Sequence, residues 1–143
     1  MAKKVQVRLP PLWSEMSNPG GPASFICGDL DEPAVLQVSL DAEYRGGAPP
    51  NPTAADLIEL AGSLGKRHGA GEVVESFGGN CDLGRFGSVV FRSTEFPRIQ
   101  FWYLSNGFDF ALASLVCSKE PEPDELSGAA EIVQTLTLGS DGS

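Results

Sequence analysis

The clearest pattern in the chain is a two-residue alternation of apolar and polar side chains between Ala34 and Tyr44. Leu36, Val38 and Leu40 fall on one face of this segment, and polar residues occupy the positions between them. Such alternation predicts a half-buried β-strand, because successive side chains of a strand point to opposite faces. Similar short apolar stretches predict further strands over residues 5–9, 23–28, 72–77 and 85–93.

A β-hairpin is predicted where an Asn-Gly pair at 106–107 separates two apolar runs. Asn and Gly favour a two-residue turn because both tolerate positive φ angles. Such a turn pairs Tyr103 with Phe110 and places Phe110 at the centre of the more apolar face. The other face has small side chains at its centre, Ala111 and Ala113, which predicts that a helix packs closely there.

Two helices are predicted from apolar residues that recur every three to four positions. The first begins at Thr53, which forms a variant of the capping box with Asp56, and it ends at Gly65. Its apolar stripe is Leu57, Leu60, Ala61 and Leu64. The second begins at Pro121 and has acidic residues in its first turn, where they interact favourably with the helix dipole. Its apolar stripe is Leu126, Ala129, Ala130, Val133 and Leu136.

These elements predict one α+β domain over residues 1–138, in which helices pack on an antiparallel sheet of about six to seven strands. The Gly-rich segment from Gly78 to Gly84 is predicted to be a loop between two strands. The polar tail, residues 139–143, is predicted to be disordered.

Three features of the chain together resemble the PsbP-like fold family. The opening reads Leu9-Pro10-Pro11-Leu12-Trp13 and then Pro19-Gly20-Gly21-Pro22, a long helix precedes the main meander, and the closing segment runs through 111–117, 120–121 and 131–136. This family includes the photosystem extrinsic protein and the Ran-binding Mog proteins. The resemblance implies an α/β/α sandwich with a non-enzymatic, protein-binding role, and it carries no catalytic residues across.

Charge and cysteine usage restrict the partners and the compartment. Nineteen acidic residues against ten basic ones give a net charge of −9. This balance argues against nucleic acid or an anionic membrane as the partner, because phosphate binding needs clustered Lys and Arg. No stretch approaches the ~18 apolar residues of a membrane span and no secretory signal is recognisable, so we expect a cytoplasmic protein. Three separated cysteines fit reduced thiols, with Cys27 and Cys117 in the core and Cys81 near solvent.

Few residues have the chemistry of a catalytic or metal site. His68 is the only histidine, and it follows a predicted helix end, where a cation balances the helix dipole. No spacing favours a pairing of His68 with Cys81 and Asp82. The Gly-rich segment lacks the Lys-Ser/Thr of a phosphate loop, and the acidic run at 29–32 lacks the later ligands of a calcium loop. We therefore expect no catalytic residue, no metal and no cofactor.

The sequence favours a non-enzymatic cytoplasmic protein-binding domain whose partner has a basic surface. An immunity-type protein that neutralises a toxin domain, or a regulatory interaction protein, is a concrete form of this hypothesis. The candidate interaction residues are Asp41 and Glu43 on a solvated strand face, and Asn80, Cys81 and Arg85 in the Gly-rich loop. The alternative is a small-ligand-binding domain or an enzyme with a pocket between sheet and helix, which a buried polar constellation would favour.

Overall fold

The computed structural model describes residues 3–11, 13–16, 23–27, 34–39, 53–106 and 110–140. The strands are β1 (Lys3–Gln6), β2 (Trp13–Met16), β3 (Ala23–Cys27), β4 (Ala34–Ser39), β5 (Glu72–Asn80), β6 (Arg85–Arg92), β7 (Arg98–Ser105), β8 (Phe110–Cys117) and β9 (Thr137–Ser140). The helices are α1 (Ala54–Arg67) and α2 (Pro123–Thr135).

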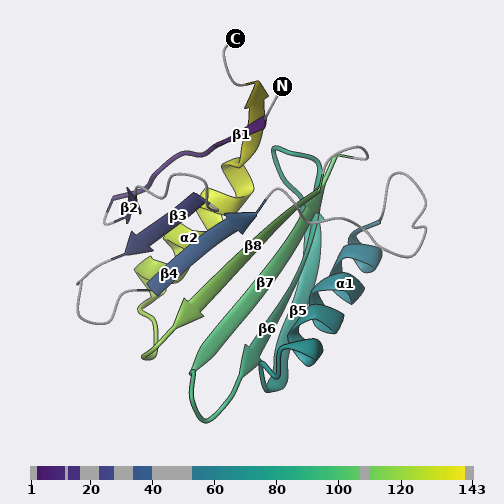
Figure 1. Ribbon diagram of the computed structural model, residues 1–143, viewed down its shortest axis with the longest axis vertical. Helices are drawn as coiled ribbons and strands as arrows, with labels where there is room; N and C mark the ends of the chain where they lie inside the picture. Colours follow the sequence, from purple (N-terminus) through teal and green to yellow (C-terminus); the bar gives the residue numbers. More distant parts are fainter. Residues whose placement is uncertain are drawn as a thin grey trace.

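The fold is a seven-stranded antiparallel sheet with one helix on each face (Figure 1). The strand order is β2-β3-β4-β8-β7-β6-β5, and β1 pairs separately with β9. Helix α1 packs mainly on β6 and β7 and also contacts β5. Helix α2 lies on the opposite face and shares a core with β2, β3, β4, β7 and β8. The predicted α+β class and α/β/α sandwich are therefore confirmed.

Helix α1 begins as the sequence predicts. The backbone N–H of Asp56 donates to the Thr53 hydroxyl at 3.1 Å, and the backbone N–H of Thr53 donates to the Asp56 carboxylate at 2.9 Å. The helix does not end at Gly65, however, but continues to Arg67. A side chain at Gly65 would collide with the ring of Phe91. This glycine therefore allows close packing of the helix on the sheet and does not terminate the helix.

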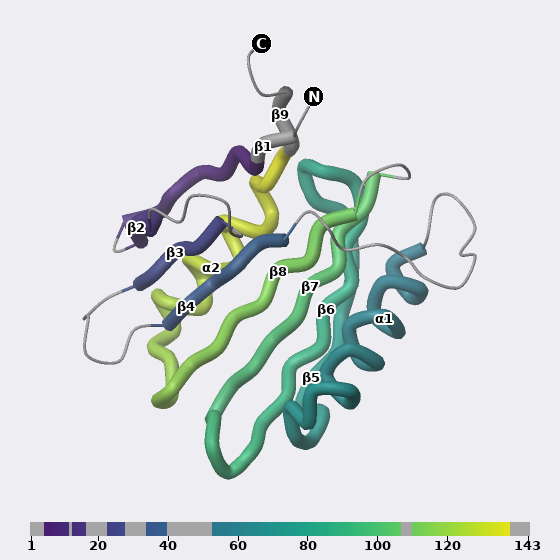
Figure 2. Tube along the Cα trace, viewed as in Figure 1, coloured from purple at the N-terminus to yellow at the C-terminus, as the bar shows by residue number. Residues whose placement is uncertain are grey.

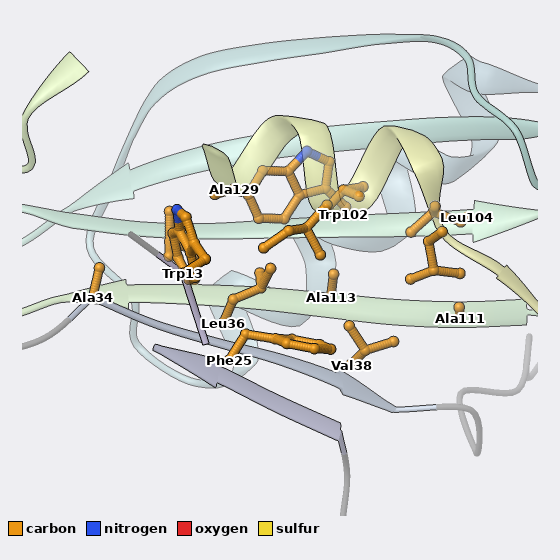
Figure 3. Close-up of a cluster of buried hydrophobic side chains, with 14 of the residues drawn as sticks. Trp13, Phe25, Ala34, Leu36, Val38, Trp102, Leu104, Ala111, Ala113 and Ala129 are labelled. Carbon is orange, nitrogen blue, oxygen red and sulfur yellow. The ribbon is translucent and has the colours of Figure 1, made fainter. Parts of the chain in front are cut away.

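Helix α2 begins at Pro123 with Glu122 as its N-cap, and four of the five residues of its predicted stripe, Leu126, Ala129, Val133 and Leu136, lie in or against the core. Its buried residues are Gly128, Ala129, Ile132 and Val133. Ala130, which was predicted to be in the stripe, is exposed. The indole of Trp13 occupies the space that a side chain at Gly128 would need, so the helix packs closely on Trp13 at this position. Figure 3 shows Trp13 and Trp102 beside this helix, next to Leu36 and Ala113 of the sheet.

The hairpin of β7 and β8 has its predicted faces but not its predicted register. Ser105 pairs with Phe110 and Tyr103 with Leu112, so four residues separate the paired ends of the strands. The expected pairing of Tyr103 with Phe110 is therefore wrong by two residues. A shift of two positions preserves the face of every side chain, because side chains alternate with a period of two. Ala111 and Ala113 accordingly lie in the α2 core, as predicted.

Two strands near the chain ends differ from the prediction. The first strand covers Lys3–Gln6 and pairs with β9, which includes Gly139 and Ser140 of the predicted tail. Residues 141–143 lie outside the described residues. Strand β2 was not predicted, because Pro10 and Pro11 interrupt the apolar pattern before it. It pairs with β3 and forms one edge of the sheet.

A buried polar chain links β6 and β7 on the α2 side. The guanidinium of Arg98 donates twice to the Gln100 side-chain carbonyl, at 3.2 and 2.8 Å. The Gln100 amide then donates to the Ser88 hydroxyl at 2.8 Å. Ser88 and Gln100 are both almost fully buried. Because each group has a partner, this chain explains how the sheet tolerates these polar side chains.

The register predicts which side chain of the β7–β8 hairpin contributes more to the free energy of unfolding. Leu104 is fully buried, whereas Phe110 is only half-buried at the start of β8. We expect Leu104→Ala to lower the free energy of unfolding by about 2–5 kcal/mol and Phe110→Ala to lower it by less. Urea denaturation of the two variants measures both values. A larger loss for Phe110→Ala would contradict the observed register.

The polar chain makes a second stability prediction. Gln100→Ala should cost about 1–3 kcal/mol beyond the lost volume, because it removes the partner of the Ser88 hydroxyl. Ser88→Ala should be destabilising for the reciprocal reason. The double variant should then cost less than the two single changes together. Strictly additive costs in denaturant titrations would show that the 2.8 Å bond contributes nothing measurable.

Candidate protein-interaction surface

The predicted Gly-rich loop is the end of a strand followed by a tight turn. Gly78, Gly79 and Asn80 belong to β5 and pair with β6, so the prediction of a loop over Gly78–Gly84 is wrong for residues 78–80 and holds only for residues 81–84. The backbone N–H groups of Cys81 and Gly84 each donate to the other residue's carbonyl, at 2.9 and 3.1 Å. These bonds close a hairpin with only two residues at its tip.

The glycine at position 78 of β5 makes room for helix α1. This is why glycines that the sequence analysis took as a sign of a loop belong to a strand. A Cβ atom at Gly78 would lie 3.0 Å from the Cβ of Ala54 and 3.2 Å from the Cδ1 of Ile58. The first turns of α1 therefore lie directly on this strand. Without a side chain at this position, the helix approaches the edge of the sheet more closely than any larger residue allows.

The turn after β5 is docked on the second helix. The backbone N–H of Asp82 donates to the carbonyl of Gln134 in α2 at 2.9 Å, and Cys81 and Leu83 pack against the α2 core. Cys81 is therefore half-buried. Burial raises the pKa of its thiol, and hydrogen bonds from the backbone of Gly84 and Leu83 oppose part of that rise. At neutral pH this thiol is protonated and a weak nucleophile.

The structure brings three of the five candidate interaction residues together. Asn80 pairs with Arg85 across the hairpin, both are exposed, and Cys81 follows directly. Asp41 and Glu43 lie outside the described residues, so their role stays a prediction. Nothing brings the histidine to this group. His68 precedes β5 and Cys81 follows it, so a nine-residue strand, roughly 30 Å long, separates them.

Strand β5 carries three exposed apolar side chains that the sequence analysis missed. Val73, Val74 and Phe77 expose 52%, 58% and 37% of their surface. Val73 pairs with Phe91 on the α1 side of the sheet, and Val74 lies in a β-bulge between Val73 and Glu75. Phe77 pairs with Ser88 on the α2 side, where its ring meets Phe86 edge-on with centroids 5.9 Å apart. The two adjacent valines were visible in the sequence, but the position of their strand at the edge was not. We call Val73, Val74 and Phe77 the β5 surface.

The described residues hold little that is typical of a catalytic or metal centre. In these ranges no three His, Cys, Asp or Glu side chains gather as a metal site. Of the helices described, neither has the length and apolarity to cross a membrane. Cys27 and Cys117 are free and buried, and burial raises the pKa of Cys117 to about 11. The ion pair between Arg92 and Glu120, 2.8 Å long, is largely exposed and therefore weak.

The thiols provide a chemical test of this arrangement. In the native protein we expect Cys81 to react slowly with a thiol reagent, and Cys27 and Cys117 to react only after unfolding. Because the pKa of Cys81 is raised above its ordinary value of 9.0, its rate should still be rising as the pH passes that value. Cys81→Ser should abolish native labelling. Labelling of this variant without denaturant would show that a core cysteine is accessible.

The comparisons with known proteins support the fold. No protein-family model matches the chain, and no curated protein matches it. The cyanobacterial PsbP (CyanoP) from Synechocystis sp. PCC 6803 is similar over 96% of this chain and 92% of its own, with a TM-score of 0.55 and 11% identity. A protein from Bacteroides thetaiotaomicron VPI-5482 is similar over 97% of this chain and 46% of its own, with a TM-score of 0.44 and 15% identity. The likeness to the cyanobacterial protein confirms that this chain has a PsbP-like fold.

Proposed function

We propose that this chain is a non-enzymatic, cytoplasmic protein-binding domain and that its partner has a basic surface. The observation that carries the proposal is the exposed apolar β5 surface, formed by Val73, Val74 and Phe77. Scattered apolar residues are normal on protein surfaces, but several on one exposed edge strand are typical of an interaction site. The exposed pair Asn80 and Arg85 lies at the far end of the same strand.

Charge and thiol chemistry support the other parts of the proposal. The net charge of −9 speeds encounter with a cationic partner, and salt screens that attraction over ~8 Å at physiological ionic strength. The cysteines of the described residues are free. Reduced thiols fit a reducing compartment such as the cytoplasm. A regulatory or immunity-type interaction is consistent with these properties.

The test is affinity capture with one surface variant and one matched control. Val74→Lys places a charge on the β5 surface. Met16→Lys makes the same change at a 46% exposed residue on β2, at the opposite edge of the sheet. We expect the wild-type protein and Met16→Lys to capture the same partner from native lysate at low salt, and Val74→Lys to lose most of it. The captured partner should be basic and its binding weaker at high salt.

Two results would contradict the proposal. A partner that both lysine variants retain equally does not bind the β5 surface. A partner that is acidic, or that binds equally at low and high salt, rules out the electrostatic part. Equal melting temperatures of the three proteins are the control for folding, because both substitutions are at exposed positions.

A further inference from the structure

Strand β5 has an unpaired backbone edge among the described residues. It is the last strand of the sheet, and Figure 2 shows it as the outermost of the four adjacent strands β5 to β8. Its described backbone hydrogen bonds all lie on the β6 side. Helix α1 packs mainly on β6 and β7, and residues 72–78 and 80 of β5 are exposed.

The register identifies the backbone groups that point outward. Cys81 and Gly84 exchange two hydrogen bonds, and the pairs of an antiparallel ladder alternate between bonded and non-bonded. The backbone N–H and C=O groups of Gly79 and Phe77 therefore form hydrogen bonds with β6. Asn80, Gly78 and Ser76 belong to the intervening pairs, so their N–H and C=O groups point away from the sheet.

Strand β5 lacks several of the features that usually protect an edge. Natural edge strands are blunted by lysine, by proline or by short length. Strand β5 is nine residues long and contains neither lysine nor proline. Its one bulge lies between Val73 and Glu75, near the start, so the regular edge runs from Glu75 to Asn80. Small side chains, at Ser76, Gly78 and Gly79, leave the backbone of this part accessible.

Side chains along the edge define the chemistry of an added strand. Glu75 and Phe77 lie two positions apart and thus on one face of β5. A neighbouring strand places a basic residue opposite Glu75 and an apolar residue opposite Phe77, also two positions apart. The charged residues of β5 are both acidic, Glu72 and Glu75. A second copy of the chain brings the same acidic strand and another net charge of −9, which opposes self-pairing.

From these observations we infer that β5 binds an extended segment of a protein partner as an eighth strand of the main sheet, and that this segment alternates basic and apolar side chains on one face. This inference rests on the proposed function and specifies the mode of binding. Main-chain hydrogen bonds from Ser76, Gly78 and Asn80 supply affinity. Glu75 and Phe77 supply the preference for a basic and an apolar side chain.

The test uses the peptide Lys-Thr-Val-Thr-Lys-Thr-Val with blocked ends, titrated into the full chain. One control peptide replaces each lysine by glutamate, and another is N-methylated at alternate residues, which removes the donors of one edge. We expect binding by the lysine peptide and about tenfold weaker binding by either control. Equal affinity for the N-methylated peptide would overturn strand addition.

Amide hydrogen exchange locates the bound peptide residue by residue. The outward N–H groups of Ser76, Gly78 and Asn80 should exchange more slowly when the lysine peptide is bound. Those of Phe77 and Gly79, bonded to β6 in the free protein, serve as internal controls and should change little. Protection that appears elsewhere and not at the outward amides would overturn the inference.

Two variants of Ser76 complete the experiment. Ser76→Pro removes an outward N–H without removing a bond to β6, and Ser76→Ala keeps that N–H. We expect the peptide affinity to fall about tenfold for proline and to stay unchanged for alanine. Equal affinities would contradict strand addition, as would concentration-dependent dimers of the free chain with the same amides protected. If the lysate partner still depends on Val74 but no peptide binds, the proposed function stands and strand addition does not.

Discussion

The fold depends on the need to bury both faces of the central strands β7 and β8. Trp102, Leu104, Ala111 and Ala113 lie on one face, while Tyr103 lies on the other. An antiparallel sheet can leave one face in water only if that face is polar. Because neither face of this pair is polar, each requires a helix, and the α/β/α arrangement follows.

The two helices meet that requirement in different ways. On the α2 side the sheet supplies small side chains, and the indoles of Trp13 and Trp102 fill the space beside the helix (Figure 3). On the α1 side the helix supplies a glycine, Gly65, that lies against Phe91. Helix α1 covers β5, β6 and β7, so side chains of β8 on its face, such as Leu112 and Val116, stay half-buried.

The β5 surface follows from the same packing. Helix α1 packs mainly on β6 and β7, and its first turns also lie against the edge strand β5. Only a small residue fits beneath these turns, and Gly78 occupies that position. Strand β5 therefore bears few large side chains near the hairpin turn. Docking of Asp82 on α2 holds that turn in place. This hydrogen bond fixes the hairpin to α2 at the end where Asn80 and Arg85 are exposed.

The sequence by itself determined both helices and most strands, though not β2 or β9, as well as the two faces of β7 and β8 and the start of α1. These features depend on local periodicity and on a capping pair, Thr53 and Asp56, only three residues apart. Only the tertiary structure decided the hairpin register, the extent of β5 and the burial of Gly128 and Ile132 on α2. Each of these depends on a contact between residues distant in sequence, such as Gly78 with Ile58 or Trp13 with Gly128. The β5 surface belongs to the same group, because a strand's place at the edge of a sheet is set by how all the strands pair.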